Sequence, residues 1–284
     1  TSNGSESTGV IPFMKVVDAE MLAFSQGVTR RGSYAAYLDI SHPEIEEFLD
    51  VRKPTGGDIN RKSTNLHPGV VLSDRFMDII ERATRIPGFN DSWDLVDPHS
   101  GNVIKTVSAK ALWVKLIQNR VETGEPYIMF GDTVDEAIPE FQRKLGLKVH
   151  QSNLCSEITL PTDKDRTAVC CLSSVNLEEY DEWKNNDQFI PDLIRMLDNV
   201  LEYFINYAPD QLARAKYSAS QERSLGLGAM GFHAYLQRHN IPFESAMAKG
   251  RNMQMFSRIK SEAERATRTL AEERGPCPDG QDYG

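Results

Sequence analysis

Apolar residues recur with helical spacing in two long segments of the chain. From Ile190 to Ile205 they fall at i, i+3, i+4 and i+7, which predicts a helix with one buried apolar stripe. A second long helix is expected from about Ser245 to Glu273, ended by Gly275. Its inward-facing residues are expected to be Met253, Phe256, Ile259, Ala263, Ala266 and Leu270. Shorter helices are predicted at residues 18–24, 43–51, 74–83 and 109–122.

Short runs rich in β-branched and aromatic residues lie between these helices and predict strands. They are residues 34–40, 69–73, 127–130, 158–160 and 168–172. Strands that alternate with helices indicate an α/β domain rather than a bundle or a sandwich.

Three segments that are polar or rich in glycine are not assigned to strands. Residues 52–58 and 90–98 are expected to be loops. Residues 224–232 contain Gly226, Gly228 and Gly231, but no strand precedes them and no Lys follows, so a phosphate-binding loop is not indicated. We expect a helix there, with small residues that allow close packing. With no repeat and no evident linker, residues 1–284 are expected to form one domain.

Composition narrows the class of protein. Of 284 residues, 40% are hydrophobic and 26% charged, which is ordinary for a soluble globular protein. The net charge of −9 argues against a general nucleic-acid binder, because such proteins need a basic surface. No apolar run approaches the ~20 residues that span a bilayer, and no signal peptide is visible. A cytoplasmic protein is therefore expected.

The cysteines point to chemistry rather than to scaffolding. The four of them, Cys155, Cys170, Cys171 and Cys277, are too few for a disulfide framework in a chain of this length. Their spacing fits no zinc site, so no metal site is expected. In a reducing compartment, cysteines that matter are more often catalytic than structural. Cys277 follows an expected helix end and is given no role.

One short cluster combines an amide, a thiol and a carboxylate at alternate positions: Asn153, Cys155 and Glu157. In an extended segment, residues i, i+2 and i+4 project to one side, so these three would converge on one small molecule. From spacing alone, an edge strand with a buried cysteine and two solvated polar residues is the commoner explanation.

The identity of the residues favours a functional site over an ordinary edge strand. The run Asn153-Leu-Cys-Ser-Glu-Ile158 resembles the finger-loop motif of class I ribonucleotide reductase large subunits. Residues 168–177 resemble the family strand that carries one cysteine of the active-site dithiol, and alignment on Leu172-Ser173 makes Cys170 the redox cysteine. Adjacent strand residues point to opposite faces, so Cys171 is expected to serve packing.

Flanking segments agree with this resemblance. Residues 9–13 and 24–33 resemble the family's specificity loop 2 and its leading helix, and residues 61–67 and 224–232 also match. The resemblance implies that Gln26, Arg30 and Arg31 report the bound effector to the substrate base. A glycine-flanked loop suits that role because it can re-aim hydrogen bonds. The alternative is a surface turn with two solvated arginines.

The resemblance implies part of a ten-stranded α/β barrel with a central finger loop. It also implies reduction of ribonucleoside diphosphates to deoxyribonucleotides by thiyl-radical chemistry. Cys155 would carry the radical, Glu157 would accept the 3′-hydroxyl proton, Asn153 would hold the ribose, and a redox-active dithiol that includes Cys170 would supply electrons. The substrate-binding residues so implied are Asn153, Leu154, Cys155, Ser156 and Glu157.

Partners are implied in the same way. The radical would come from a separate metal-containing small subunit, with no cofactor bound by this chain. ATP and deoxynucleotides would be effectors, a thioredoxin- or glutaredoxin-type protein the reductant, and a homodimer the assembly. Nucleic acid and membrane are not expected as partners.

Several family parts have no counterpart in this sequence. They are the N-terminal effector cone, the strand of the second dithiol cysteine, the relay tyrosines and the tail cysteines. A central fragment of a longer or split large subunit, inactive alone, is therefore expected. Two alternatives remain open: an inert nucleotide-binding or subunit-interaction module, and a cobalamin-dependent reductase of the same superfamily.

Overall fold

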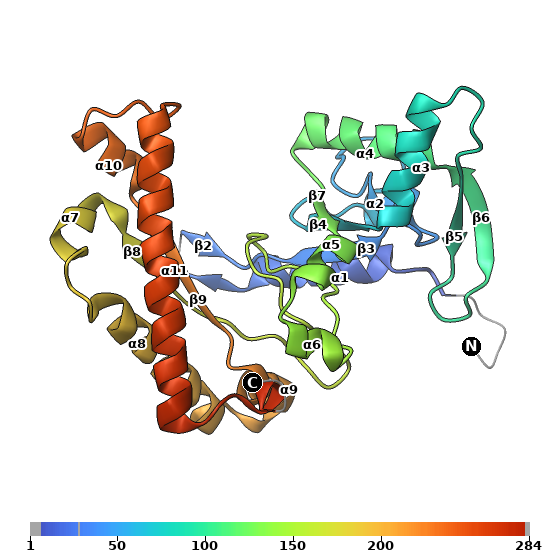
Figure 1. Cartoon of the computed structure of the whole chain (residues 1–284). Helices are drawn as coiled ribbons and strands as arrows, with labels where there is room; N and C mark the ends of the chain where they lie inside the picture. Colours follow the sequence, from blue (N-terminus) through green and yellow to red (C-terminus); the bar gives the residue numbers. More distant parts are fainter. Residues whose placement is uncertain (1–6, 28, 282–284) are drawn as a thin grey trace. The chain divides into compact units, whose positions relative to one another are not determined.

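The chain folds into two compact units, described for residues 7–27 and 29–281 in a computed structural model (Figure 1). Unit 1 comprises Thr1–Pro139 and Lys148–Pro161, and unit 2 comprises Glu140–Leu147 and Thr162–Gly284. The chain therefore crosses between the units more than once. This explains why no single stretch of linker composition marks a boundary.

A three-stranded parallel sheet forms the centre of unit 1. Its order is β3 (Ala35–Asp39), β4 (His67–Leu72) and β7 (Tyr127–Phe130). The register places Gly69 beside both Tyr37 and Tyr127. All three strands were predicted from the sequence: β7 has its predicted bounds, and the ends of β3 and β4 are shifted by one or two residues.

Both faces of this sheet are covered, as parallel sheets require. One face belongs to the main core, where Val70 and Leu72 are fully buried. That core also takes residues from α2 (Ile45–Phe48), α3 (Asp74–Arg85) and α4 (Ala109–Thr123). The alternate residues Tyr37, Val71 and Met129 pack on the opposite face, in a smaller cluster with Ile138 and Val149. The second face is the one that matters for the candidate site.

Helix boundaries in unit 1 follow local capping. Ser73 Oγ accepts the amide of Phe76 at 3.3 Å at the start of α3, and Ser108 Oγ accepts that of Ala111 at 3.0 Å at the start of α4. Helix α1 (Ile11–Ala23) begins earlier than expected. The short helix α5 (Gly131–Ala137) directly follows β7.

The prediction of a loop at residues 90–98 is wrong. Strand β5 (Ser92–Val96) pairs antiparallel with β6 (Val103–Ser108). Alternation explains the pairing, because Trp93 and Leu95 are buried while Asp94 is exposed. Asp97 Oδ1 accepts the amides of His99 and Ser100 at 2.9 and 2.7 Å, which closes the connecting turn.

Unit 2 is built on a parallel pair of strands, β8 (Cys171–Asn176) and β9 (Leu225–Met230), in which Leu172 lies opposite Gly226. The helix expected over residues 224–232 is therefore wrong. Parallel neighbours need a long crossover, and helices α8 (Phe189–Tyr207) and α9 (Ala213–Glu222) provide it. Helices α10 (Phe232–Arg238) and α11 (Ala246–Arg274) follow, and the short helices α6 (Glu140–Lys144) and α7 (Tyr180–Trp183) complete the unit.

The two long helices predicted from periodicity are confirmed as α8 and α11. Ser245 Oγ caps α11 by accepting the amide of Ala248 at 3.1 Å, and Gly275 ends it. Ile259, Ala266 and Leu270 are buried as expected, and Ala263 is partly buried. Met253 and Phe256 are instead 60% and 42% exposed. Met255 takes the buried position, so the apolar stripe is rotated in the first half of the helix.

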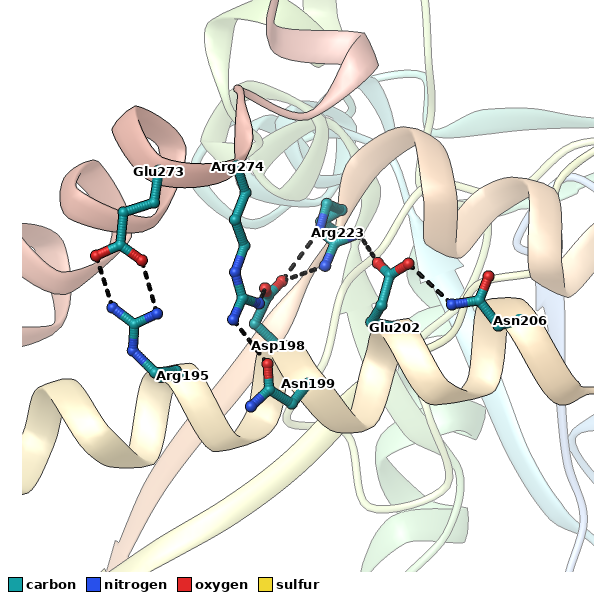
Figure 2. Close-up of polar contacts among 8 residues, drawn as sticks. All are labelled: Arg195, Asp198, Asn199, Glu202, Asn206, Arg223, Glu273 and Arg274. Carbon is teal, nitrogen blue, oxygen red and sulfur yellow. Dashed lines mark hydrogen bonds and ion pairs between the residues drawn. The ribbon is translucent and has the colours of Figure 1, made fainter.

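Ion pairs join the helices of unit 2 (Figure 2). Asp198 on α8 accepts from Arg223, the left-handed cap residue of α9, at 3.0 and 2.6 Å. Its second oxygen accepts from Arg274 in the last turn of α11. Arg223 also donates to Glu202 at 2.7 Å. Three helix segments thus meet on one carboxylate that is only 8% exposed.

A buried ion pair ties together distant parts of unit 2. Arg166 donates two parallel hydrogen bonds to Asp279, at 2.6 and 2.8 Å. The two side chains are 8% and 4% exposed, and Arg166 also lies over the ring of Tyr217. The pair fixes the segment that leads to Cys170 against the turn at Pro278–Gly280.

Candidate functional site

The segment that carries Asn153, Cys155 and Glu157 is a tight loop rather than a strand. The amide of Ser156 donates to the carbonyl of Asn153 at 3.1 Å, and the amide of Asn153 donates to that of Ile158 at 3.3 Å. Ser156 has a φ of +67°, which an extended segment does not allow. The strand expected at residues 158–160 is wrong, and the argument from alternate positions does not apply.

The side chain of Asn153 explains why a loop forms. Its Oδ1 accepts the backbone amides of Glu157 and Ile158, both at 3.0 Å, and the hydroxyl of Ser152 at 3.2 Å. Such local bonds offer the backbone an alternative to a strand ladder. Because the oxygen is used within the loop, the Nδ2 amide is the group left to donate to a ligand.

The tip of the loop presents its reactive groups to solvent. Cys155, Ser156 and Glu157 are exposed, while Asn153 and Leu154 are half-buried. A thiol, a carboxylate and an amide are thus gathered within five consecutive residues by a turn. This set can hold hydroxyl groups, accept a proton and supply a sulfur to one small molecule.

The second face of the unit 1 sheet lies against this loop. Tyr37 Oη is 3.5 Å from Ser156 Oγ. Burial raises the pKa of Tyr127, and the nearby Glu125, Tyr37 and Cys155 raise this pKa further. Together these observations place the loop beside two tyrosines of β3 and β7.

His67 and Glu125 also lie beside Tyr127. The ring of His67 stacks on that of Tyr127, with centroids 6.1 Å apart and planes 9° from parallel. His67 Nδ1 is 2.7 Å from Glu125 Oε1. The sequence analysis interpreted Tyr127 only as part of a strand, and it gave His67 and Glu125 no role at a site.

Cys171 is the first residue of β8 in unit 2, and Cys170 directly precedes this strand. The strand predicted at residues 168–172 therefore begins three residues later than expected. A Cβ added to Gly226 would lie 2.3 Å from Leu172 Cδ2 and 3.2 Å from Cys170 Sγ, so these two side chains share a face. Leu172 is 54% exposed, whereas Val175, on the alternate set with Cys171, is in the core. Cys171 is half-buried, and burial raises the pKa of its thiol. This agrees with a packing role for Cys171.

Comparison with known proteins assigns this geometry to a family. The family described as "Ribonucleotide reductase, barrel domain" matches residues 1–282. The chain belongs to this family. The predicted α/β barrel class is thereby confirmed, and a solved class Id alpha subunit confirms the predicted kinship with class I large subunits. The described residues show two parallel sheets, one in each unit, and not a closed barrel.

Two of the relatives that match this chain come from viruses. The "Putative ribonucleoside-diphosphate reductase large subunit" of Frog virus 3 is 53% identical over 99% of the chain and 48% of its own length. The large subunit of Invertebrate iridescent virus 3 is 45% identical over 96% of the chain and 51% of its own length. The chain therefore spans about half the length of the curated relatives it matches.

A solved structure agrees with the fold. The Actinobacillus ureae class Id ribonucleotide reductase alpha subunit matches with a TM-score of 0.81 and 32% identity. The match covers 99% of this chain and 49% of that subunit.

The segment predicted to be the specificity loop contains two short paired strands. Strands β1 (Ser25–Gln26) and β2 (Arg30–Arg31) pair antiparallel, with Gln26 opposite Arg30. The side chain of Gln26 lies outside the described residues. Arg30 and Arg31 are exposed, and as neighbours on a strand they point to opposite sides. Their role as effector reporters stays a prediction.

The described residues form neither a metal-ligand cluster nor a helix suited to a membrane. Across residues 7–27 and 29–281, no three His, Cys, Asp or Glu side chains gather as a metal site would need. Within the same residues, no helix combines the length and apolarity needed to cross a bilayer.

Cys277 is half-buried in unit 2, and burial raises the pKa of its thiol.

Proposed function

We propose that this chain supplies the radical-cysteine loop and one dithiol strand of a ribonucleoside-diphosphate reductase. One observation carries the proposal most directly: Cys155 stands exposed at the tip of a turn that is closed by Asn153 and flanked by Glu157. Family membership and the reductase names of the relatives support it.

The proposed chemistry assigns one task to each side chain. A Cys155 thiyl radical takes the 3′ hydrogen of the ribose, so that a C–H bond breaks and an S–H bond forms. Glu157 accepts the 3′-hydroxyl proton, and the Asn153 Nδ2 amide donates to a ribose hydroxyl. Cys170 and a second thiol supply two electrons and two protons as their sulfurs form a disulfide. One proton leaves with the 2′-hydroxyl as water, and the other completes the new C2′–H bond. Glu157 then returns its proton to the 3′ oxygen, and the Cys155 S–H returns its hydrogen atom to C3′, which restores the thiyl radical.

The remaining parts come from other chains or segments. We propose that a metal-containing small subunit delivers the radical and that a thioredoxin- or glutaredoxin-type protein reduces the disulfide. ATP and deoxynucleotides would act as effectors through the hairpin of Gln26, Arg30 and Arg31. We further propose that the chain is an incomplete barrel domain that acts within a longer or split large subunit, as a homodimer, in the reducing cytoplasm.

Activity of a completed assembly tests this proposal. The chain would be produced with a segment that completes the large subunit, combined with a class I radical subunit and a dithiol reductant, and assayed for conversion of CDP to dCDP. Cys155→Ser should abolish turnover. Cys277→Ser is the matched control and should leave turnover near the parent level, because Cys277 lies outside the proposed chemistry.

A different outcome would favour an inert module. If the completed assembly bound CDP without reducing it, or if Cys155→Ser remained active, the thiyl mechanism would be rejected for this chain. Activity that needed added cobalamin and no radical subunit would instead identify the other reductase class.

A further inference from the structure

We propose that Tyr37 is a positioning residue that holds the tip of the cysteine loop through Ser156. This inference rests on the proposed function and adds a residue outside the loop to it. The contact itself is between Tyr37 Oη and Ser156 Oγ, which are 3.5 Å apart and 119 positions apart in sequence. Ser156 directly follows Cys155, so a change at Ser156 moves the sulfur.

The position of the Tyr37 ring depends on a glycine in the next strand, because any larger residue there would clash with the ring. Gly69 lies opposite Tyr37 in the parallel register. A Cβ built on Gly69 would lie 2.5 Å from two ring carbons of Tyr37, closer than carbon atoms approach. A glycine inside a strand costs stability, and it commonly marks a position where another group must approach closely. Here that group is the ring of Tyr37.

The contact between Tyr37 and Ser156 lies at the wall of a hollow. This hollow, of about 230 Å³, is lined by Tyr37, the β7 residues, Thr133 and Val134 of α5, and Ser152, Ser156 and Thr159 of the loop. Ser156 also holds a left-handed conformation, with φ at +67°, which a non-glycine residue keeps only when its surroundings favour it. Tyr37 provides such a contact.

The contact between Tyr37 and Ser156 affects the proposed reaction through the position of the Cys155 sulfur. Abstraction of a hydrogen by sulfur depends steeply on the distance between the two atoms, and small misplacements cost large factors in rate. Loss of the Tyr37 hydroxyl should therefore slow hydrogen abstraction and leave substrate binding almost unchanged. It should also loosen the turn in which the amide of Ser156 donates to Asn153.

The test uses Tyr37→Phe in the completed large subunit with its radical subunit. We expect kcat to fall about tenfold with KM changed less than about twofold. The isotope effect with 3′-deuterated CDP should rise, because abstraction becomes more rate-limiting. Hydrogen exchange of the loop amides at residues 156–158 should be faster, and this readout does not depend on turnover.

A double-mutant cycle shows whether the effect passes through Ser156. Ser156→Ala should give a similar loss, and the double variant should lose no more than either single one. Tyr34→Phe is the matched control, because Tyr34 is also a partly buried tyrosine but packs against the opposite, main core. It should leave kcat, isotope effect and exchange unchanged.

The inference and the proposed function fail in different ways. Parent-like values for Tyr37→Phe, a change confined to KM, or additive losses with Ser156→Ala would each overturn the role of Tyr37. Activity that survives Cys155→Ser would instead overturn the proposed function, whatever Tyr37→Phe does. The exchange measurement still decides whether Tyr37 supports the loop in that case.

Discussion

The backbone amide of Glu157 donates to the side-chain oxygen of Asn153 at 3.0 Å. The two residues proposed to handle the ribose are therefore parts of one hydrogen-bonded turn. Asn153 has two separable tasks: its oxygen closes the loop, and its Nδ2 amide is available to a ligand. The two can be distinguished by substitution.

Asn153→Asp keeps an oxygen for the amides of Glu157 and Ile158 but removes the Nδ2 donor. We expect the loop to remain closed while CDP reduction in the completed assembly falls by about a hundredfold, as for other lost transition-state donors. Asn153→Ala removes both functions, so it should also speed hydrogen exchange at residues 157 and 158. Equal exchange in the Asp and Ala variants would show that the side chain does not close the loop.

Gly226 keeps space for the side chains on the exposed face of β8. Gly226→Ala would place a Cβ against Leu172 and near Cys170, and should destabilise unit 2 by about 1–3 kcal/mol. Gly250→Ala is the control, because a Cβ at this position of α11 meets nothing and alanine favours a helix. Urea unfolding of both variants measures the difference. Similar stability of the two would contradict the crowding at Gly226.

Asp198 binds two arginines from different helices (Figure 2). Asp198→Ala should lower the free energy of unfolding by about 2–3 kcal/mol, because two guanidinium groups lose a shared, mostly buried partner. This is less than for a fully buried pair, since the arginines are 24% and 34% exposed. Glu273→Ala breaks the exposed pair with Arg195 and should change stability little. Denaturant titration measures the free energy of unfolding of both variants. An equal loss of stability in the two would refute the special role of Asp198.

Glu222 makes the stability of unit 2 depend on pH. Burial raises the pKa of Glu222 above its ordinary value of 4.5, against hydrogen bonds from Ser218 and Ser224 that lower it. The folded state then holds a proton that the unfolded state has released, so this contribution to stability is lost as pH rises from 4.5 through the raised pKa. We expect the Tm of the parent to fall relative to Glu222→Gln over that range. A constant difference would show that Glu222 titrates normally.

The sequence predicted the parts of the fold that depend on a strong local period. Helix α8 and helix α11 were found because their apolar stripes repeat every 3.6 residues over many turns. Strand β9 was missed because Leu225, Leu227 and Ala229 alternate with glycines, and small residues also suit a packed helix. Its partner β8 lies about 50 residues earlier, so no local signal shows the pairing.

The sequence proposes residues for the candidate site but did not predict the conformation of the loop that carries them. A motif identifies Asn153, Cys155 and Glu157, whereas the turn follows from side-chain bonds that alternation does not reveal. Tyr37 could not be found from local sequence either. Its place depends on Gly69 in the next strand and on Ser156, and both relations are set by tertiary structure.

The Arg166–Asp279 pair has a consequence for synthesis on the ribosome. The two residues are 113 positions apart, so Arg166 emerges long before its partner carboxylate exists. A buried guanidinium without a partner is strongly unfavourable, and the segment before Cys170 therefore stays open to solvent while α8, α9 and α11 are made. Asp279 then acts as a late closing contact. A nascent chain cannot fix the approach to Cys170 until the turn at Pro278–Gly280 has left the exit tunnel.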